Sequence, residues 1–200
     1  MKKPIDVFDN KSLKDLSRRE FLKISSLASS GLVIGMTLSS RSAVAAGEGT
    51  FQPNAFLSIG TEGRIIIMSK NPEIGQGVKT SMPQIIAEEL EVDWTQIEVQ
   101  QAPLDGRLGD QFAGGSTAIN TNFDELRKAG ASAREMLIEA AARKWQVALS
   151  DCYAKSGFIH RKNSDAKLSY GDLASDASKI SRRENPKLKE KKDYTLIGKA

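Results

Sequence analysis

Hydrophobic positions in the first half of the chain predict a hairpin, a helix and a further strand. Apolar runs at 55–58 and 64–69 flank Gly-Thr-Glu-Gly, a spacing typical of a β-hairpin with a glycine-containing turn. The second run, Ile-Ile-Ile-Met, is apolar on both faces and predicts a strand covered on both sides. Helical spacing then predicts a helix from residue 79 or 80 to 90, and 97–101 alternates as a strand. The apolar helix face holds Met82, Ile85, Ile86 and Leu90.

The second half of the chain opens on a long polar loop and continues into its clearest helix. Residues 103–121 are mostly Gly, Asp, Ala and Ser, and a loop of about 19 residues in a compact domain is usually functional or disordered. Apolar residues then recur at i, i+3, i+4 and i+7 over 122–147, with Asn122 or Thr121 available as the cap. Small residues on this helix should let another element approach closely. They are Ala129, Gly130, Ala131 and Ala133.

Two short strands, at 152–155 and 158–161, and a last short helix that opens at 168–173 complete the pattern. We therefore expect an α/β fold, in which a small mixed sheet carries two main helices on one face. The two helices are 79–90 and 123–147.

The first 45 residues have the order of features found in a twin-arginine export signal. The sequence SRREFLK at 17–23 precedes a weakly apolar stretch at 24–38 and Ala-Val-Ala at 43–45, a small-x-small cleavage site. The apolar stretch is about 15 residues long, whereas a membrane-spanning helix needs roughly 20. We predict periplasmic export through the twin-arginine translocase and cleavage near Ala45. The alternatives are an uncleaved amphipathic helix and a chance pair of arginines.

Residues 1–45 also carry the whole net charge of the chain. They hold 8 of the 29 basic and 4 of the 25 acidic side chains, which leaves 21 of each in the remainder. The basic pI therefore does not indicate nucleic-acid binding. Basic residues gather again at 179–192, a stretch with no aromatic residue for base stacking, and we interpret it as a solvated linker. The predicted divisions are a signal at 1–45, one domain at 46–178 and a basic linker at 179–200.

Cysteine and histidine are too few for several kinds of site. Cys152 is the single cysteine and His160 the single histidine. Zinc and iron–sulfur sites need several such ligands at set spacing, and no Ser-His-Asp arrangement stands out around one histidine. We expect Cys152 to be buried and His160 to lie in a hairpin, and we assign no catalytic or metal-ligating residue.

Two glycine-rich loops carry the candidate chemistry. They are Gly75-Gln76-Gly77 and Gly114-Gly115-Ser116-Thr117, each ahead of a predicted helix. Glycine lets the backbone approach a ligand, successive amides can cradle phosphate oxygens, and helix N-termini favour anions. Gln76 offers a donor and an acceptor to a heterocycle, and the hydroxyl groups of Ser116 and Thr117 suit a pyrophosphate. Neither loop matches a named nucleotide fingerprint, so plain strand-to-helix connections are the alternative.

The ordered set of motifs resembles the molybdenum-binding large subunit of the xanthine oxidase family. The set comprises EIGQG at 73–77, AEEL at 87–90, IEV at 97–99, GGST at 114–117 and the alanine-rich helix at 127–141. The resemblance covers most of the chain after the signal. It is nearest to the exported branch of isoquinoline 1-oxidoreductase beta subunits and periplasmic aldehyde dehydrogenases.

This resemblance implies an oxidoreductase that inserts a water-derived oxygen into an aldehyde or an N-heteroaromatic C–H bond. The implied cofactor is molybdenum–molybdopterin cytosine dinucleotide, and the implied partner is a small [2Fe–2S] subunit, with a c-type cytochrome as a candidate acceptor. Gln76 would hydrogen-bond the cofactor, and the GGST loop would line the pterin or its pyrophosphate. The residues assigned to cofactor binding are Gly75, Gln76, Gly77, Gly115, Ser116 and Thr117.

The family's large subunits are several times longer than this chain. The parts that supply the second cofactor loop, the substrate-pocket arginine and the glutamate base have no counterpart here, and Glu73, Glu88 and Glu89 are expected at the surface of a helix or loop. We therefore expect the N-terminal portion of a hydroxylase subunit, inactive alone, with exposed apolar surface on both helices. Half of a split subunit and a non-catalytic exported binding module are the alternatives.

Overall fold

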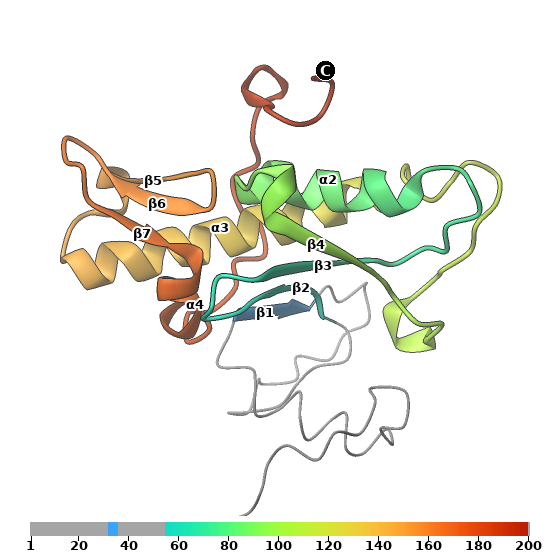
Figure 1. The fold of residues 1–200 in the computed structure, drawn as a ribbon, viewed down its shortest axis with the longest axis horizontal. Coiled ribbons are helices and arrows are strands. Elements are labelled where there is room, and N and C mark those ends of the chain that lie inside the picture. Colours follow the sequence, from blue (N-terminus) through green and yellow to red (C-terminus); the bar gives the residue numbers. More distant parts are fainter. Residues whose placement is uncertain (1–31, 36–54, 200) are drawn as a thin grey trace, which may run out of the picture.

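The computed structural model describes residues 32–35 and 55–199, which form two sheets and three α-helices (Figure 1). The larger sheet has the strand order β1-β2-β3-β4. Its strands are Leu32–Gly35, Ala55–Ile59, Ile65–Ser69 and Ile97–Gln101. β1, β2 and β3 pair in antiparallel fashion, whereas β3 and β4 are parallel and are joined through α2, Val78–Leu90. The expected mixed α/β fold is confirmed, as are the β2–β3 hairpin and the strand at 97–101.

The smaller sheet is an antiparallel meander that follows α3, Phe123–Trp145, and precedes α4, Tyr170–Ala177. Its strands are β5, Cys152–Lys155, β6, Phe158–Arg161, and β7, Lys167–Ser169. The expected helix start at 168 is wrong, because Leu168 pairs with β6 and the side chain of Ser169 caps α4. Cys152 is buried and His160 lies in the β5–β6 hairpin, as expected.

β1 falls inside the segment that the sequence predicts to be a signal. Its residues pair with β2 at the edge of the larger sheet, so this stretch of the predicted segment 1–45 takes part in the sheet. A short apolar run can complete the backbone hydrogen bonds of a sheet edge. The twin-arginine motif at 17–23 and the cleavage site near Ala45 lie outside the described residues.

α2 and α3 lie on one face of the larger sheet (Figure 1). On β3, Ile65 and Ile67 are buried, whereas Ile66 and Met68 on the opposite face are only partly covered. The expectation of a strand fully covered on both sides is therefore wrong. Both main helices sit on the same side, so only one face of β3 gains a complete apolar cover.

α2 and α3 pack against each other at the small residues of α3. A Cβ placed on Gly130 would lie 2.4 Å from the carbonyl oxygen of Ile86 and 2.9 Å from the Cβ of Glu89. Ala129 and Ala133 are fully buried in the same contact region of the core. The close helix approach predicted from the small residues is confirmed.

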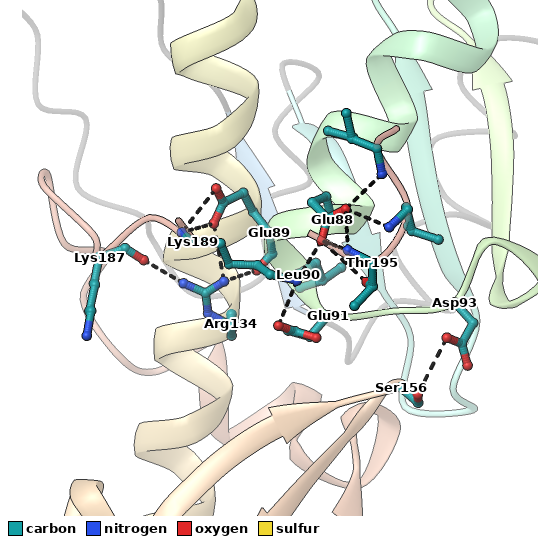
Figure 2. A network of polar contacts seen from close by, with 12 residues as sticks. Glu88, Glu89, Leu90, Glu91, Asp93, Arg134, Ser156, Lys187, Lys189 and Thr195 are labelled. Atoms are coloured by element: carbon teal, nitrogen blue, oxygen red, sulfur yellow. Dashed lines mark hydrogen bonds and ion pairs between the residues drawn. The ribbon is translucent and has the colours of Figure 1, made fainter. Parts of the chain in front are cut away.

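The C-terminal segment, residues 179–199, returns across α2 and is held by buried Glu88 (Figure 2). The Glu88 carboxylate accepts the backbone N–H groups of Thr195, Leu196 and Ile197 at distances from 2.7 to 3.0 Å. It also accepts a hydrogen bond from Lys189 Nζ at 2.5 Å. The Thr195 hydroxyl adds a further hydrogen bond at 3.3 Å, so five donors converge on one carboxylate that is 1% exposed.

Glu89 makes a second buried anchor between α2, α3 and the C-terminal segment. Arg127 and Arg134 contact its carboxylate at 2.6 and 3.2 Å, and Lys189 donates its backbone N–H at 3.0 Å. The expected surface positions of Glu88 and Glu89 are wrong, since both are buried. The interpretation of 179–192 as fully solvated is also wrong, because the Lys189 side chain is only 6% exposed.

Large apolar side chains are exposed in loops rather than on the two main helices. Ile74, Leu104 and Phe112 are the most exposed of them, whereas the large apolar residues of α2 and α3 are buried or half-buried. The exposed apolar surface expected on those helices is therefore wrong. None of the helices in the described ranges combines the length and the apolar character that a membrane crossing requires.

Candidate functional site

Glu73 closes the first glycine-rich loop at the N-terminus of α2. Its carboxylate accepts the backbone N–H groups of Gly75, Gly77 and Lys79 at 2.8, 3.0 and 2.9 Å. These hydrogen bonds, those from Lys79 and Gly77 first, lower the pKa of the Glu73 carboxyl group. Glu73 is exposed, as expected. Since its carboxylate already meets the preference of this helix N-terminus for an anion, α2 does not by itself indicate a phosphate site.

Gln76 folds its side chain back onto its own loop. Its Oε1 accepts the N–H of Ile74 at 2.7 Å, and its Nε2 donates to the carbonyl of Pro72 at 3.0 Å. A side-chain amide has two N–H groups, so one remains for another acceptor. Gly75 and Gly77 have φ values of 103° and 79°, and no atom of the described chain lies within 4 Å of a Cβ built there. The loop backbone is therefore open to a close approach.

The second glycine-rich loop is a tight turn with both central residues in the left-handed region. Gly115 and Ser116 have φ values of 60° and 55°, and the N–H of Thr117 donates to the carbonyl of Gly114 at 3.3 Å. The left-handed conformation costs a non-glycine residue about 1–2 kcal/mol. Such strain often marks ligand-binding positions.

The same turn presents donors that the chain itself does not use. Within the described residues, the backbone N–H groups of Gly115 and Ser116 and the Ser116 hydroxyl have no hydrogen-bond acceptor. The Thr117 hydroxyl differs, because it donates to the carbonyl of Gly114 at 3.0 Å. Thr117 therefore offers a ligand its acceptor lone pairs rather than the expected donor.

Both loops line one cavity of about 420 Å³. It brings Gln76 together with Gly115, Ser116 and Thr117, as a shared site requires. Gly75 and Gly77 flank Gln76 without lining the cavity themselves. The lining comprises Ile74, Gln76, Val78, Ser81 and the stretch 113–119.

Residues that the sequence did not point to hold the long loop at 103–121 against β3. Asn71 Nδ2 donates to the carbonyl of Phe112 at 2.8 Å, and Gln111 Nε2 donates to the carbonyl of Lys70 at 2.9 Å. The loop therefore has a defined, hydrogen-bonded course along the cavity. The only available signal was the polar pair Lys70-Asn71 directly after an apolar strand.

The cavity suits a heterocyclic cofactor that carries phosphate groups. The adjacent N–H groups of Gly115 and Ser116, which have no acceptor within the described residues, are of a kind that can bind an oxyanion. Ile74, Val78 and Ile119 add apolar surface for a ring. In the ranges that the structure describes, no cluster of three or more His, Cys, Asp or Glu side chains is placed to hold a metal ion.

Comparisons with known proteins identify relatives of the chain. A family model described as "Molybdopterin cofactor-binding domain" matches residues 15–199. The chain is 34% identical over 128 residues to isoquinoline 1-oxidoreductase subunit beta of Brevundimonas diminuta. It is 30% identical over 127 residues to membrane-bound aldehyde dehydrogenase (pyrroloquinoline-quinone) of Gluconacetobacter polyoxogenes.

These alignments cover 60% and 64% of this chain but 16% of each relative, so the chain spans about a sixth of their length. Among solved structures, the Cu,Mo-CO dehydrogenase in its carbon monoxide reduced state gives a TM-score of 0.51 at 22% identity. That match covers 60% of this chain and 15% of the dehydrogenase chain, and it shows a shared fold.

Proposed function

Because the chain belongs to the molybdopterin cofactor-binding domain family, we propose that its two glycine-rich loops form one wall of a site for a molybdenum–molybdopterin cofactor in the cytosine dinucleotide form. The observation that carries the proposal is the convergence of Gln76 and the Gly114–Thr117 turn on one cavity. This wall would bind and orient the cofactor, which supplies oxygen-transfer chemistry when bound. The residues that complete the site would come from elsewhere in the assembled enzyme.

The two loops have separate roles in this proposal. Gly75 and Gly77 leave the backbone open, and Gln76 directs its remaining N–H toward the edge of the pterin ring. The N–H groups of Gly115 and Ser116 would bind the pyrophosphate, because successive free amides bind oxyanions well.

We propose that the whole protein is a molybdenum hydroxylase that acts on aldehydes or N-heteroaromatic compounds. The names of the two relatives support both substrate classes, and one of them is named as a subunit. The proposed partners are a small [2Fe–2S] subunit and a c-type cytochrome that accepts electrons.

The pyrophosphate role can be tested by titrating the ¹⁵N-labelled chain with cytidine 5′-diphosphate. We expect amide shifts centred on Gly115 and Ser116 and a dissociation constant on the order of 1 mM, since only one wall of the site is present. Gly115→Val should weaken binding about tenfold, because a β-branched residue resists the left-handed conformation. Ser116→Gly keeps both amides and the turn, so its effect should stay within about threefold.

Two results of that titration would contradict the proposal. One is a set of shifts that spares residues 114–117. The other is a response of the same amides to pyrroloquinoline quinone but not to cytidine diphosphate, which would assign the cavity to the quinone in the name of the second relative.

Periplasmic localisation through the twin-arginine translocase is proposed from the sequence at 17–23. A green fluorescent protein fused after residue 50 should be found, folded and fluorescent, in the periplasmic fraction. The paired variant Arg18→Lys, Arg19→Lys keeps the charge but loses the guanidinium groups, so we expect the fluorescence to remain in the cytoplasm. The control pair Lys11→Arg, Lys14→Arg should be exported normally. Export of the Arg18, Arg19 variant would rule out this route.

A further inference from the structure

Lys70 and Asn122 form a buried polar contact behind the wall of the cavity. Lys70 directly follows β3, and Asn122 directly precedes α3. Each residue is 4% exposed, and Lys70 Nζ donates to Asn122 Oδ1 at 2.9 Å. Asn122 is the N-cap residue of α3, as predicted, but its side chain makes no capping hydrogen bond and contacts Lys70 instead.

Hydrogen bonds continue from Asn122 into the cavity wall. Asn122 Nδ2 donates to the carbonyl of Ala118 at 2.8 Å. Thr121 donates both its N–H and its hydroxyl to the carbonyl of Thr117, at 3.0 and 2.9 Å. Ala118 and Thr117 line the cavity. A continuous polar path therefore connects the Lys70 ammonium group to the turn that carries the free amides.

The other end of the cavity wall, at Phe112, is hydrogen-bonded to Asn71, the residue next to Lys70. Asn71 holds the carbonyl of Phe112, whose ring lies so close to Gly114 that a Cβ on this glycine would be 2.4 Å from it. Lys70 and Asn71 thus anchor the two ends of the stretch 112–122. The turn at Gly114–Thr117 lies between the two anchor points.

Burying the ammonium group of a lysine costs free energy, so Lys70 is not explained by the need to fill space. Burial lowers the pKa of Lys70, and this effect outweighs the opposing influence of the Glu125 and Asp110 carboxylates. An apolar side chain of similar volume would avoid the desolvation of an ammonium group. Burial of the cation is therefore explained by the contact that it makes rather than by packing.

We propose that Lys70 is a positioning residue, which acts through Asn122 to set the geometry of the Gly114–Thr117 turn and so the affinity of the cavity for a pyrophosphate-bearing ligand. This inference rests on the proposed function. It assigns no contact between Lys70 and the ligand. It predicts instead that the two side chains act as one unit.

A double-mutant cycle tests this coupling with cytidine 5′-diphosphate as the probe. Lys70→Met, Asn122→Leu and the double variant should each raise the dissociation constant by a similar factor of about ten, because loss of either partner breaks the same path. Lys155→Met, an exposed lysine on β5, is the matched control and should leave the constant unchanged. If the factor for the double variant equals the product of the two single-variant factors, the two side chains act independently and the coupling is overturned.

Amide hydrogen exchange supplies a readout that does not depend on the ligand. In Lys70→Met, the Thr121 amide should exchange at least tenfold faster, while amides of β5 and β6 keep their protection. Unchanged exchange at Thr121, or a uniform loss of protection across the chain, would refute a positioning role. If the wild-type chain does not bind the probe, the proposed function fails, and the exchange of Thr121 still decides whether Lys70 holds the wall.

Discussion

Replacing Glu88 with glutamine should lower the free energy of unfolding by about 3–5 kcal/mol, since it removes one partner of a buried ion pair. The isosteric amide retains one oxygen where two oxygens now accept three backbone N–H groups and the Lys189 ammonium group. The NH₂ group of the introduced glutamine would face other donors instead of an acceptor. For a domain of this size, thermal unfolding should shift downwards by about 10 °C.

Glu139→Gln is the matched control for this substitution. Glu139 pairs with Arg143 at 2.6 Å across one turn of α3, and the arginine side chain is 67% exposed. An exposed pair of this kind contributes less than about 1 kcal/mol. Equal losses of stability in the two variants would contradict the special role of the buried carboxylate.

The contribution of Glu88 to the free energy of unfolding should also depend on pH. Burial would raise the pKa of Glu88 and is the largest single influence, but hydrogen bonds from Lys189 and three backbone N–H groups together outweigh it and lower the pKa below its ordinary value of 4.5. Because the folded-state pKa lies below the unfolded-state value, the stabilisation is present above pH 4.5 and is lost as pH falls through the folded-state pKa. The difference in the free energy of unfolding between wild type and Glu88→Gln, measured with urea, should therefore shrink below pH 4.5.

Gly130→Ala should destabilise the protein by about 1–3 kcal/mol, although alanine normally favours a helix. The added methyl group would lie 2.4 Å from the backbone oxygen of Ile86, which cannot move without displacing α2. Such a displacement would also disturb Glu88 and Glu89, which lie on α2 and hold the C-terminal segment. Urea unfolding at neutral pH measures the loss.

Gly106→Ala is the control for the glycine prediction. No atom of the described chain lies within 4 Å of a Cβ at Gly106, and its φ is not in the left-handed region. Its stability should match that of wild type or rise by about 0.4–1 kcal/mol. A Gly130→Ala variant as stable as Gly106→Ala would show that the two helices can separate without cost.

Part of the candidate site could be predicted from the sequence. The two loops were recognisable because glycine next to a polar residue ahead of a helix is a local pattern, and Gln76 and Ser116 do line one cavity. Their ligand contacts remain a proposal. Lys70 and Asn122 could not be found in this way, because they are 52 positions apart and neither belongs to a motif.

The sequence by itself determined most of the helices and strands, because hydrophobic period and glycine turns are properties of neighbouring residues. It did not predict β1 and β7, two edge strands whose pairing depends on a neighbouring strand. It did not determine where the charges lie. Glu88 and Glu89 resemble a solvated helix face, and Lys189 a solvated linker, until the chain brings positions 100 residues apart into contact. Only tertiary structure decides such positions, since a buried carboxylate is stable only where its donors converge. The same reason applies to the cavity, whose two loops are far apart in the sequence and line it together only in the folded chain.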